Sequence, residues 1–365
     1  MIGTYGASFI YPGDSNYYNV ALTNSSSTTS VSKIAPTVIV TANQGSATLG
    51  STISFTATVT APSGGTTPTN GAGFASWSIT GVSGVTSCTS TGGPSGSSNV
   101  AIYTCSVVAS KVGVYDATII YPGDNNYLTA SASTNNTTDT TVGKTTATVL
   151  VTANASTGLI GSSIAFTATV SGPTNGATPA GVGTWSVTGV PGITACTSTG
   201  GPTGSTNVAT YTCSINATLA GTYGATFTFA ADSNYFAITP TASISTTLVN
   251  LGTPTITVVP NSTSVALGSS YIITATVTPP NGGSLPTGAG TWTITGVTGV
   301  SCASTTGPTN GSGSISYTCT VVASVAGTYG STFKYLGDTN YSSVQVAATT
   351  TTTVAHRKAS RWCVF

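Results

Sequence analysis

The fold is decided by residues 113–127, which read GVYDATIIYPGDNNY. A strand-like alternation of apolar and polar residues is followed by a tight turn and the start of a second strand. The same pattern recurs at residues 3–17 (GTYGASFIYPGDSNY), 221–235 (GTYGATFTFAADSNY) and 327–341 (GTYGSTFKYLGDTNY). Self-similarity at a long, regular period predicts an array of like domains.

Each copy of this pattern places an aspartate in its turn, namely Asp14, Asp124, Asp232 and Asp338. In most copies a glycine precedes the aspartate. Glycine takes positive φ freely and aspartate can bond its own backbone, so both are turn residues. We expect the four aspartates at equivalent turns of successive repeats, far apart from one another.

The repeats divide the 365 residues into segments. Residues 1–33 are predicted to be the C-terminal part of a truncated repeat, and residues 34–142, 143–250 and 251–353 are complete repeats. Residues 354–365 form a basic tail, predicted to be a solvated terminus rather than a site for acidic polymer. Because the first motif lacks the strands that should precede it, we expect Met1 to be an internal start. The alternative is that this N-terminal hairpin pairs with something else.

The complete repeats share further strand patterns. Ile53, Phe55, Ala57 and Val59 alternate with polar residues, as do their counterparts in residues 164–170 and 271–277. One tryptophan per repeat is predicted to anchor the core between two sheets, with sugar stacking as the weaker alternative: Trp77, Trp185 and Trp292. Residues 87–94 and their copies are predicted to be loops, and residues 129–142 an exposed edge strand. The spacers are short, so three sandwiches in series predict a rod of roughly 120 Å.

Each complete repeat carries one cysteine pair at the same spacing: Cys88 with Cys105, Cys196 with Cys213, and Cys302 with Cys319. A zinc site needs four ligands, and the single histidine, His356, lies in the tail. We therefore predict three disulfides, with buried free thiols as the alternative. Disulfides persist in oxidising compartments, which favours a secreted or cell-surface protein. Cys363 is left without a partner in this scheme.

Composition excludes several functions. Only 4% of residues are charged and the net charge is +1, so neither nucleic acid nor an anionic membrane is an expected partner. No apolar run is long enough to span a membrane, and no export signal is visible, so we expect that signal in a missing upstream part. Carboxylates spread over separate repeats cannot form a glycosidase pair, and a serine or cysteine nucleophile lacks a base. Calcium at Asp124 would have one carboxylate, too few for a convincing site. No cofactor is predicted.

The run at residues 50–59 (GSTISFTATV), its copy at 161–170 (GSSIAFTATV) and the Tyr-x-Gly-Asp-x-Asn-Tyr turn resemble bacterial Ig-like repeats of group 3. The resemblance covers residues 34–353 in three copies, and the Gly113 to Tyr115 strand start is similar to a tyrosine corner. It implies an all-β fold of tandem Ig-like β-sandwich domains in a rod-like array. Residues 229–232, FAAD, depart from the pattern, so the turn geometry there is open.

These observations favour a non-enzymatic, extracellular structural or stalk array on a secreted or cell-surface protein. The alternative is an adhesive or carbohydrate-binding module that stacks exposed aromatics on sugars, with Tyr17, Tyr18, Tyr127 and Tyr235 as the candidates. Its partner would be a cell-surface polysaccharide or another surface protein.

Overall fold

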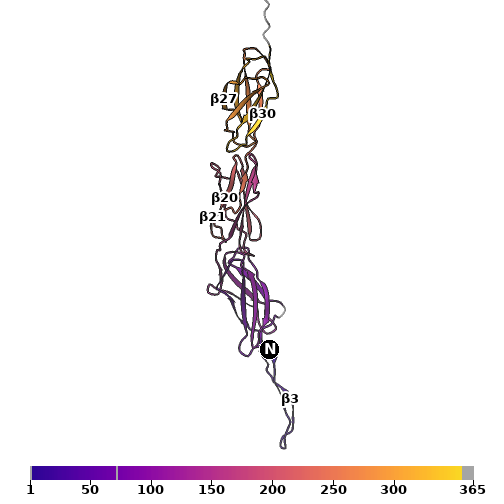
Figure 1. Cartoon of the computed structure of the whole chain (residues 1–365). Helices are drawn as coiled ribbons and strands as arrows, with labels where there is room; N and C mark the ends of the chain where they lie inside the picture. Colours follow the sequence, from indigo (N-terminus) through magenta and orange to yellow (C-terminus); the bar gives the residue numbers. More distant parts are fainter. Residues whose placement is uncertain (1, 71–72, 356–365) are drawn as a thin grey trace, which may run out of the picture.

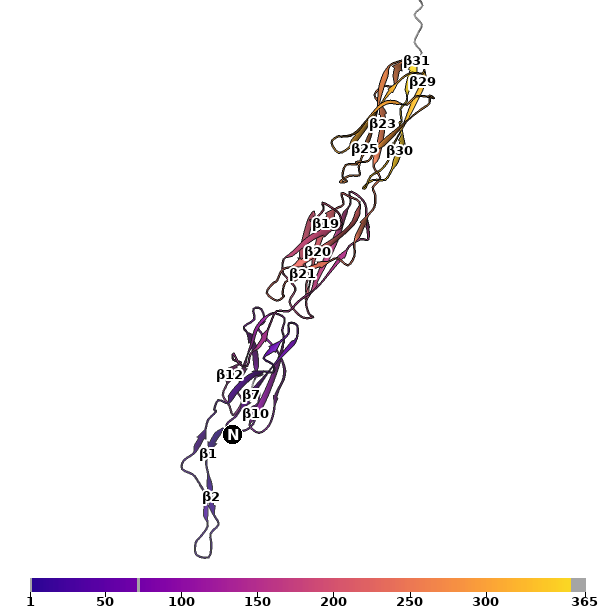
Figure 2. The ribbon, with the colours of Figure 1, turned by 60° about the vertical axis from the view of Figure 1, so that its left-hand side comes forward.

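The computed structural model describes residues 2–70 and 73–355, and every regular element in those ranges is a β-strand. Three repeats follow one another along a line, and a thin N-terminal segment projects from one end (Figures 1 and 2). The chain is an all-β, rod-like array of tandem Ig-like sandwiches, as predicted. The predicted tail, from residue 356 on, lies outside the described residues and includes His356 and Cys363.

The first complete repeat is a sandwich of a four-stranded and a five-stranded sheet. Its strands are β5 (Thr37–Ala42), β6 (Ser46–Ala47), β7 (Thr52–Thr60), β8 (Ser76–Thr80), β9 (Thr89–Ser95), β10 (Val100–Val108), β11 (Gly113–Tyr121), β12 (Ala130–Ser133) and β13 (Thr140–Val142). One sheet has the order β5-β7-β10-β9, and in the other β11 pairs with β8, β12 and β13, with β6 beside β13. This is the strand order of a constant-type immunoglobulin sandwich.

The second and third repeats have the same topology. The second consists of β14 (Thr148–Ala153), β15 (Thr157–Gly158), β16 (Ser163–Ser171), β17 (Gly183–Thr188), β18 (Ser198–Thr203), β19 (Val208–Asn216), β20 (Gly221–Phe229), β21 (Ile238–Ala242) and β22 (Thr247–Val249). The third consists of β23 (Thr255–Pro260), β24 (Ser264–Ala266), β25 (Ser270–Thr278), β26 (Gly290–Thr295), β27 (Cys302–Asn310), β28 (Ile315–Val322), β29 (Gly327–Tyr335), β30 (Val344–Ala347) and β31 (Thr352–Ala355). Val354, in the predicted tail, is a buried residue of β31, so the third repeat runs past residue 353.

The N-terminal segment contains four short strands. They are β1 (Gly3–Tyr5), β2 (Ser8–Tyr11), β3 (Val20–Asn24) and β4 (Thr29–Val31). β1 pairs with β4 and β2 pairs with β3, both antiparallel. Most of its side chains are exposed, in contrast to the three repeats.

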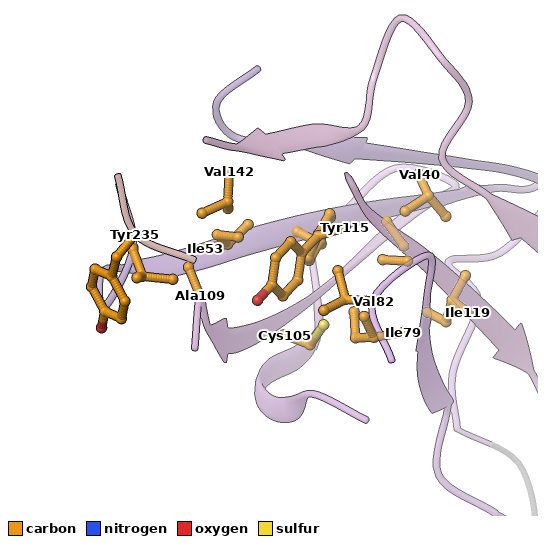
Figure 3. Packing of buried hydrophobic residues seen from close by; sticks show 14 of the residues in the cluster. Val40, Ile53, Ile79, Val82, Cys105, Ala109, Tyr115, Ile119, Val142 and Tyr235 are labelled. Carbon is orange, nitrogen blue, oxygen red and sulfur yellow. The ribbon is translucent and has the colours of Figure 1, made fainter. Parts of the chain in front are cut away.

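The core lies between the two sheets of each repeat and follows the period of two in the sequence. In β7, Ile53, Phe55, Ala57 and Val59 are fully buried, while the residues between them reach the surface. Figure 3 shows Ile53 and Cys105 in the same cluster as Tyr115. Apolar side chains at alternate positions therefore decide which face of each strand turns inward.

The tryptophans are not the central core residues. Trp77, Trp185 and Trp292 are partly buried and pack against the core from β8, β17 and β26. The largest fully buried side chains are tyrosines and phenylalanines, Tyr115 and Phe166 among them. In β8 and β17 the tryptophan lies on the same strand face as a more deeply buried residue two positions on, Ile79 and Val187. The predicted core anchors are therefore peripheral to the core.

The loop prediction is wrong, and the edge prediction holds only in part. Residues 89–95 form the edge strand β9, which pairs with β10, and β18 and β27 repeat this arrangement. A register shift lies near the Gly-Gly-Pro run, because proline cannot donate to a ladder. Residues 129–142 contain two strands, of which β12 lies at the edge of its sheet as predicted. The second, β13, lies inside the sheet, and its Thr140 is fully buried and donates to the Gln44 carbonyl at 2.6 Å. Composition suggested loop or edge, but main-chain pairing decided the structure.

Candidate functional site: the turn at each repeat junction

The aspartate of each turn organises the turn around itself. In the third repeat, Asp338 Oδ1 accepts hydrogen bonds from the backbone N–H groups of Asn340 at 2.8 Å and Tyr341 at 2.9 Å. Asp14, Asp124 and Asp232 accept the corresponding two bonds. An aspartate that bonds the backbone two and three residues ahead is the expected Asx turn. The four aspartates lie at equivalent turns, as predicted from the sequence.

The second repeat keeps these bonds on a different backbone. Gly337 has a φ of +85°, and a Cβ there would lie 2.8 Å from the Tyr341 carbonyl oxygen, so glycine is required. Ala231 takes the equivalent position in the second repeat and is not among the residues with positive φ. The FAAD departure therefore changes the backbone of the turn while its aspartate bonds persist.

The second carboxylate oxygen ties the turn to a neighbouring loop. Asp338 Oδ2 accepts from the Thr287 N–H at 2.6 Å and from the Tyr335 hydroxyl at 2.7 Å. Asp232 Oδ2 accepts from the Ala180 N–H at 2.7 Å, but Phe229 replaces the tyrosine and offers no hydroxyl. The aspartate is thus bonded more extensively in the third repeat than in the second.

These bonds alter the acidity of the turn. Burial by itself raises the pKa of Asp338, but the N–H donors and the Tyr335 hydroxyl lower it by more, so the net pKa lies below the usual value. The pKa of Asp124 is lowered in the same way. Conversely, burial and then the charge of Asp124 raise the pKa of Tyr103 to about 12. The carboxylates therefore stay ionised and the tyrosine stays neutral at neutral pH.

In the three complete repeats, the tyrosine that ends the motif is buried rather than exposed. Tyr127 and Tyr235 are 4% and 0% exposed, and their hydroxyls donate to the carbonyls of Thr66 and Ala177. These two residues cannot stack on a sugar, so that part of the carbohydrate prediction is wrong. Tyr17 and Tyr18 in the N-terminal segment are 70% and 96% exposed.

The turn also contacts the preceding repeat. Asn234 Oδ1 accepts a hydrogen bond from the Val112 N–H at 3.0 Å, and Asn340 Oδ1 accepts from the Ala220 N–H at the same distance. Lys144, in the linker, donates from Nζ to the carbonyl oxygen of Asp232 at 2.5 Å. The turn is therefore the point at which one repeat is fastened to the next.

A tyrosine corner positions the donor of that contact. The Tyr115 hydroxyl donates to the Lys111 carbonyl at 2.9 Å, and the neighbouring residue is Val112. The Tyr223 hydroxyl bonds the Leu219 carbonyl in the same way, next to Ala220. The corner resembling that of Ig-like sandwiches is thus confirmed, and it orients the N–H that reaches the following repeat.

Apolar contacts continue through the junctions. Leu49 and Ile160, at equivalent positions facing the next repeat, are 3% and 5% exposed, whereas Leu267 at the far end of the array is less buried. One cluster of buried residues joins the first repeat to Tyr235 of the second, which Figure 3 shows beside Ala109. Hydrophobic clusters normally mark one core per domain. Here they extend across the boundary between domains.

The cysteine pairs form three disulfides, Cys88–Cys105, Cys196–Cys213 and Cys302–Cys319, as predicted. Each links an edge strand, or a residue one or two positions ahead of it, to the buried face of the adjacent strand. In residues 2–70 and 73–355, no group of three or more His, Cys, Asp or Glu side chains could hold a metal ion. The same ranges contain no helix long and apolar enough to cross a membrane.

No family model and no curated protein sequence matches the chain. Among solved structures, the Escherichia coli adhesin FdeC is 15% identical with a TM-score of 0.30, over 87% of this chain and 96% of that one. Invasin, a bacterial integrin-binding protein, is 17% identical with a TM-score of 0.39, over 88% of this chain and 60% of that one. Surface layer protein SbsC is 14% identical with a TM-score of 0.26, over 89% and 55% of the two chains. These similarities concern the fold alone.

Proposed function

We propose that this chain is a non-enzymatic, extracellular structural array, which holds a distal domain away from a cell surface or builds a surface layer. The observation that carries the proposal is the repeated junction: Asn234 and Asn340 each accept an N–H from the preceding repeat at 3.0 Å. A contact that recurs at each boundary between complete repeats is what a spacer of fixed length needs. We assign the repeats to the bacterial Ig-like class of group 3.

Other features support the same role. The disulfides suit an oxidising, extracellular setting. Interfaces between domains of one chain usually permit relative motion unless they are well packed and apolar. Leu49 and Ile160 supply buried apolar contacts at the two junctions, and the asparagines add directional bonds. The repeats should therefore keep their mutual orientation in solution.

Two equivalent glycines allow this rigidity to be tested. Gly161 and Gly268 have φ values of +85° and +90°, so alanine strains the backbone at both sites. A Cβ at Gly161 would lie 2.0 Å from the Asn281 carbonyl oxygen in the next repeat, whereas one at Gly268 meets nothing within 4 Å. The two substitutions therefore share the local strain and differ in the junction contact.

Small-angle scattering of the wild type, Gly161→Ala and Gly268→Ala would measure this difference. We expect a rod with one maximum dimension for the wild type and Gly268→Ala, and a bent or broader distribution for Gly161→Ala. A wild-type ensemble already as broad as that of Gly161→Ala would contradict the proposal. Saturable hydrolysis of a polymer by the purified chain would also contradict it.

The adhesive or carbohydrate-binding alternative retains one specific observation. Tyr17 and Tyr18 lie side by side in sequence and are both strongly exposed, as stacking on a sugar would require. A polysaccharide panel should show saturable binding that Tyr18→Ala abolishes without unfolding the chain. Phe74, also strongly exposed but distant in sequence, provides the matched control in Phe74→Ala.

A further inference from the structure

The N-terminal segment corresponds, position by position, to the last strands of the second repeat. Gly3 pairs with Val31 as Gly221 pairs with Val249. The hairpin of β2 and β3 repeats the register of β20 and β21, including the register shift before the last pair. Residues 3–31 therefore already have the strand pairing of one part of a sandwich.

The segment is also joined to the first repeat as a complete repeat would be. Lys33 Nζ donates to the Asp124 carbonyl at 2.5 Å, as Lys144 does to Asp232. The Ile34 bridge to Tyr127 is parallel, like the bridges that follow the second and third linkers. The segment thus occupies the place of a further repeat at the end of the rod (Figure 2).

What differs is burial. Tyr5 and Phe9 are 50% and 67% exposed, while their counterparts Tyr223 and Phe227 are both 0% exposed. In the second repeat, the ring of Phe227 lies 4.9 Å from those of Trp185 and Tyr211, measured between centroids. The second repeat therefore shows which residues cover the equivalent face in a complete sandwich.

Among the described residues, β2 also has fewer strand neighbours than β20. β20 pairs with β17 on one side and β21 on the other. Within residues 2–70 and 73–355, β2 pairs with β3 alone. An open strand edge beside an apolar face attracts another β-strand. A sugar or a flat apolar surface would cover the apolar face but leave the backbone groups along the edge of β2 without strand pairing.

We propose that residues 3–31 form a docking face for a polypeptide with the strand pattern of residues 143–219, the first part of an Ig-like repeat. Docking adds a strand equivalent to β17 along β2 and lays an opposing sheet over Tyr5, Phe9 and Tyr17. Asp14, in the turn, is the one charged side chain among residues 3–31, so recognition rests mainly on main-chain pairing and apolar burial. Tyr17 then becomes buried like Tyr235.

The test uses the full chain and an extended chain, in which a copy of residues 143–219 is joined directly ahead of Ile2. Hydrogen exchange is followed by mass spectrometry for residues 3–31. In the extended chain we expect exchange there to slow by at least about 100-fold, to the level of residues 221–249. Exchange as fast as in the unextended chain, both with this extension and with the second one described below, would overturn the proposal.

Phe9 and Ile10 give a matched pair of variants, because both are strongly exposed in the unextended chain. Their counterparts diverge: Phe227 is fully buried and Thr228 is not. In the extended chain, Phe9→Asp should abolish the protection and Ile10→Asp should keep it. Equal effects of the two substitutions would overturn the assignment of the docking face.

A second extension guards against a copy that fails to fold. Residues 34–111 joined ahead of Ile2 offer the same pattern from the first repeat, and protection with either extension supports the proposal. Failure of both overturns it. Sedimentation of the unextended chain addresses the other occupant: a dimer lost in Phe9→Asp would show that a second copy covers the face, and would also overturn it. None of these readouts depends on whether the rod is a spacer.

Discussion

At the scale of single residues, the turn aspartate accepts a different set of hydrogen bonds in different repeats. Asp338 accepts from two backbone N–H groups in its turn, from Thr287 and from Tyr335. Asp232 lacks the hydroxyl partner because Phe229 replaces the tyrosine. Removing an acceptor leaves its donors unsatisfied, and that loss grows with the number of buried donors.

We therefore expect Asp338→Ala to destabilise the third repeat by about 2 to 4 kcal/mol, and Asp232→Ala to destabilise the second by about 1 kcal/mol less. Hydrogen exchange resolved by repeat would measure each loss. The first repeat serves as the internal reference for Asp338→Ala, whose turn bonds the second repeat through Asn340. The third repeat serves for Asp232→Ala, whose turn bonds the first repeat through Asn234. A larger loss for Asp232→Ala would show that the tyrosine hydroxyl is unimportant.

Stability should depend on pH only at the extremes. The folded pKa values of Asp124 and Asp338 are lowered, so their contribution is present above about pH 4 and is lost as the pH falls through the folded values. The folded pKa of Tyr103 is raised to about 12, so its contribution is present below about pH 10 and is lost as the pH rises further. The melting temperature should be nearly constant from about pH 5 to 9. A steep change inside that window would identify another titrating group.

At the scale of elements, each disulfide closes a loop between an edge strand and the core. The separation is 17 residues in all three repeats. On the chain-entropy estimate, replacing both Cys302 and Cys319 by serine should cost the third repeat about 3 kcal/mol. Exchange measurements should confine the loss to that repeat and leave the second unchanged. Equal destabilisation of both would instead mean that the junction couples their unfolding.

Elements with strong alternation could be predicted from the sequence. The period of two from Ile53 to Val59 predicts a buried strand face, and the cysteine spacing predicts the disulfides. The edge strand β9 could not be found this way, because Gly-Gly-Pro favours a loop and the pairing partner β10 supplies what composition lacks. The burial of Tyr127 could not be predicted from the sequence either, because its hydroxyl bonds the carbonyl of Thr66, which is distant in sequence.

At the scale of the whole molecule, the junction was invisible in the sequence. Asn340 lies two residues after its turn aspartate, where any polar residue would be ordinary. Its partner is the backbone N–H of Ala220, and a backbone group leaves no signal in the sequence. Equivalence of repeats predicts similar domains but says nothing about the contacts between them. The rod shape is predicted from the short linkers, whereas the contacts that we propose to keep the rod rigid are visible only in the structure.

The rod should also be insensitive to salt. Seven basic and six acidic residues give a net charge of +1, so screening has little to act on. We expect the same maximum dimension by scattering, and the same melting temperature, between about 0.02 and 0.5 M sodium chloride. Shortening of the rod at high salt would reveal charge repulsion between repeats.

The parallel pairing of β6 with β13 has a mechanical consequence. Thr141 lies opposite Ser46 and Val142 opposite Ala47, beside the point where the chain leaves the first repeat. Tension applied along the rod enters through β5 and leaves through β13, so it loads these hydrogen bonds in shear, together rather than one after another. Even after they rupture, the disulfide withholds the residues between Cys88 and Cys105 from extension. Each repeat is therefore arranged to resist stretching and to lengthen less than its full sequence would allow.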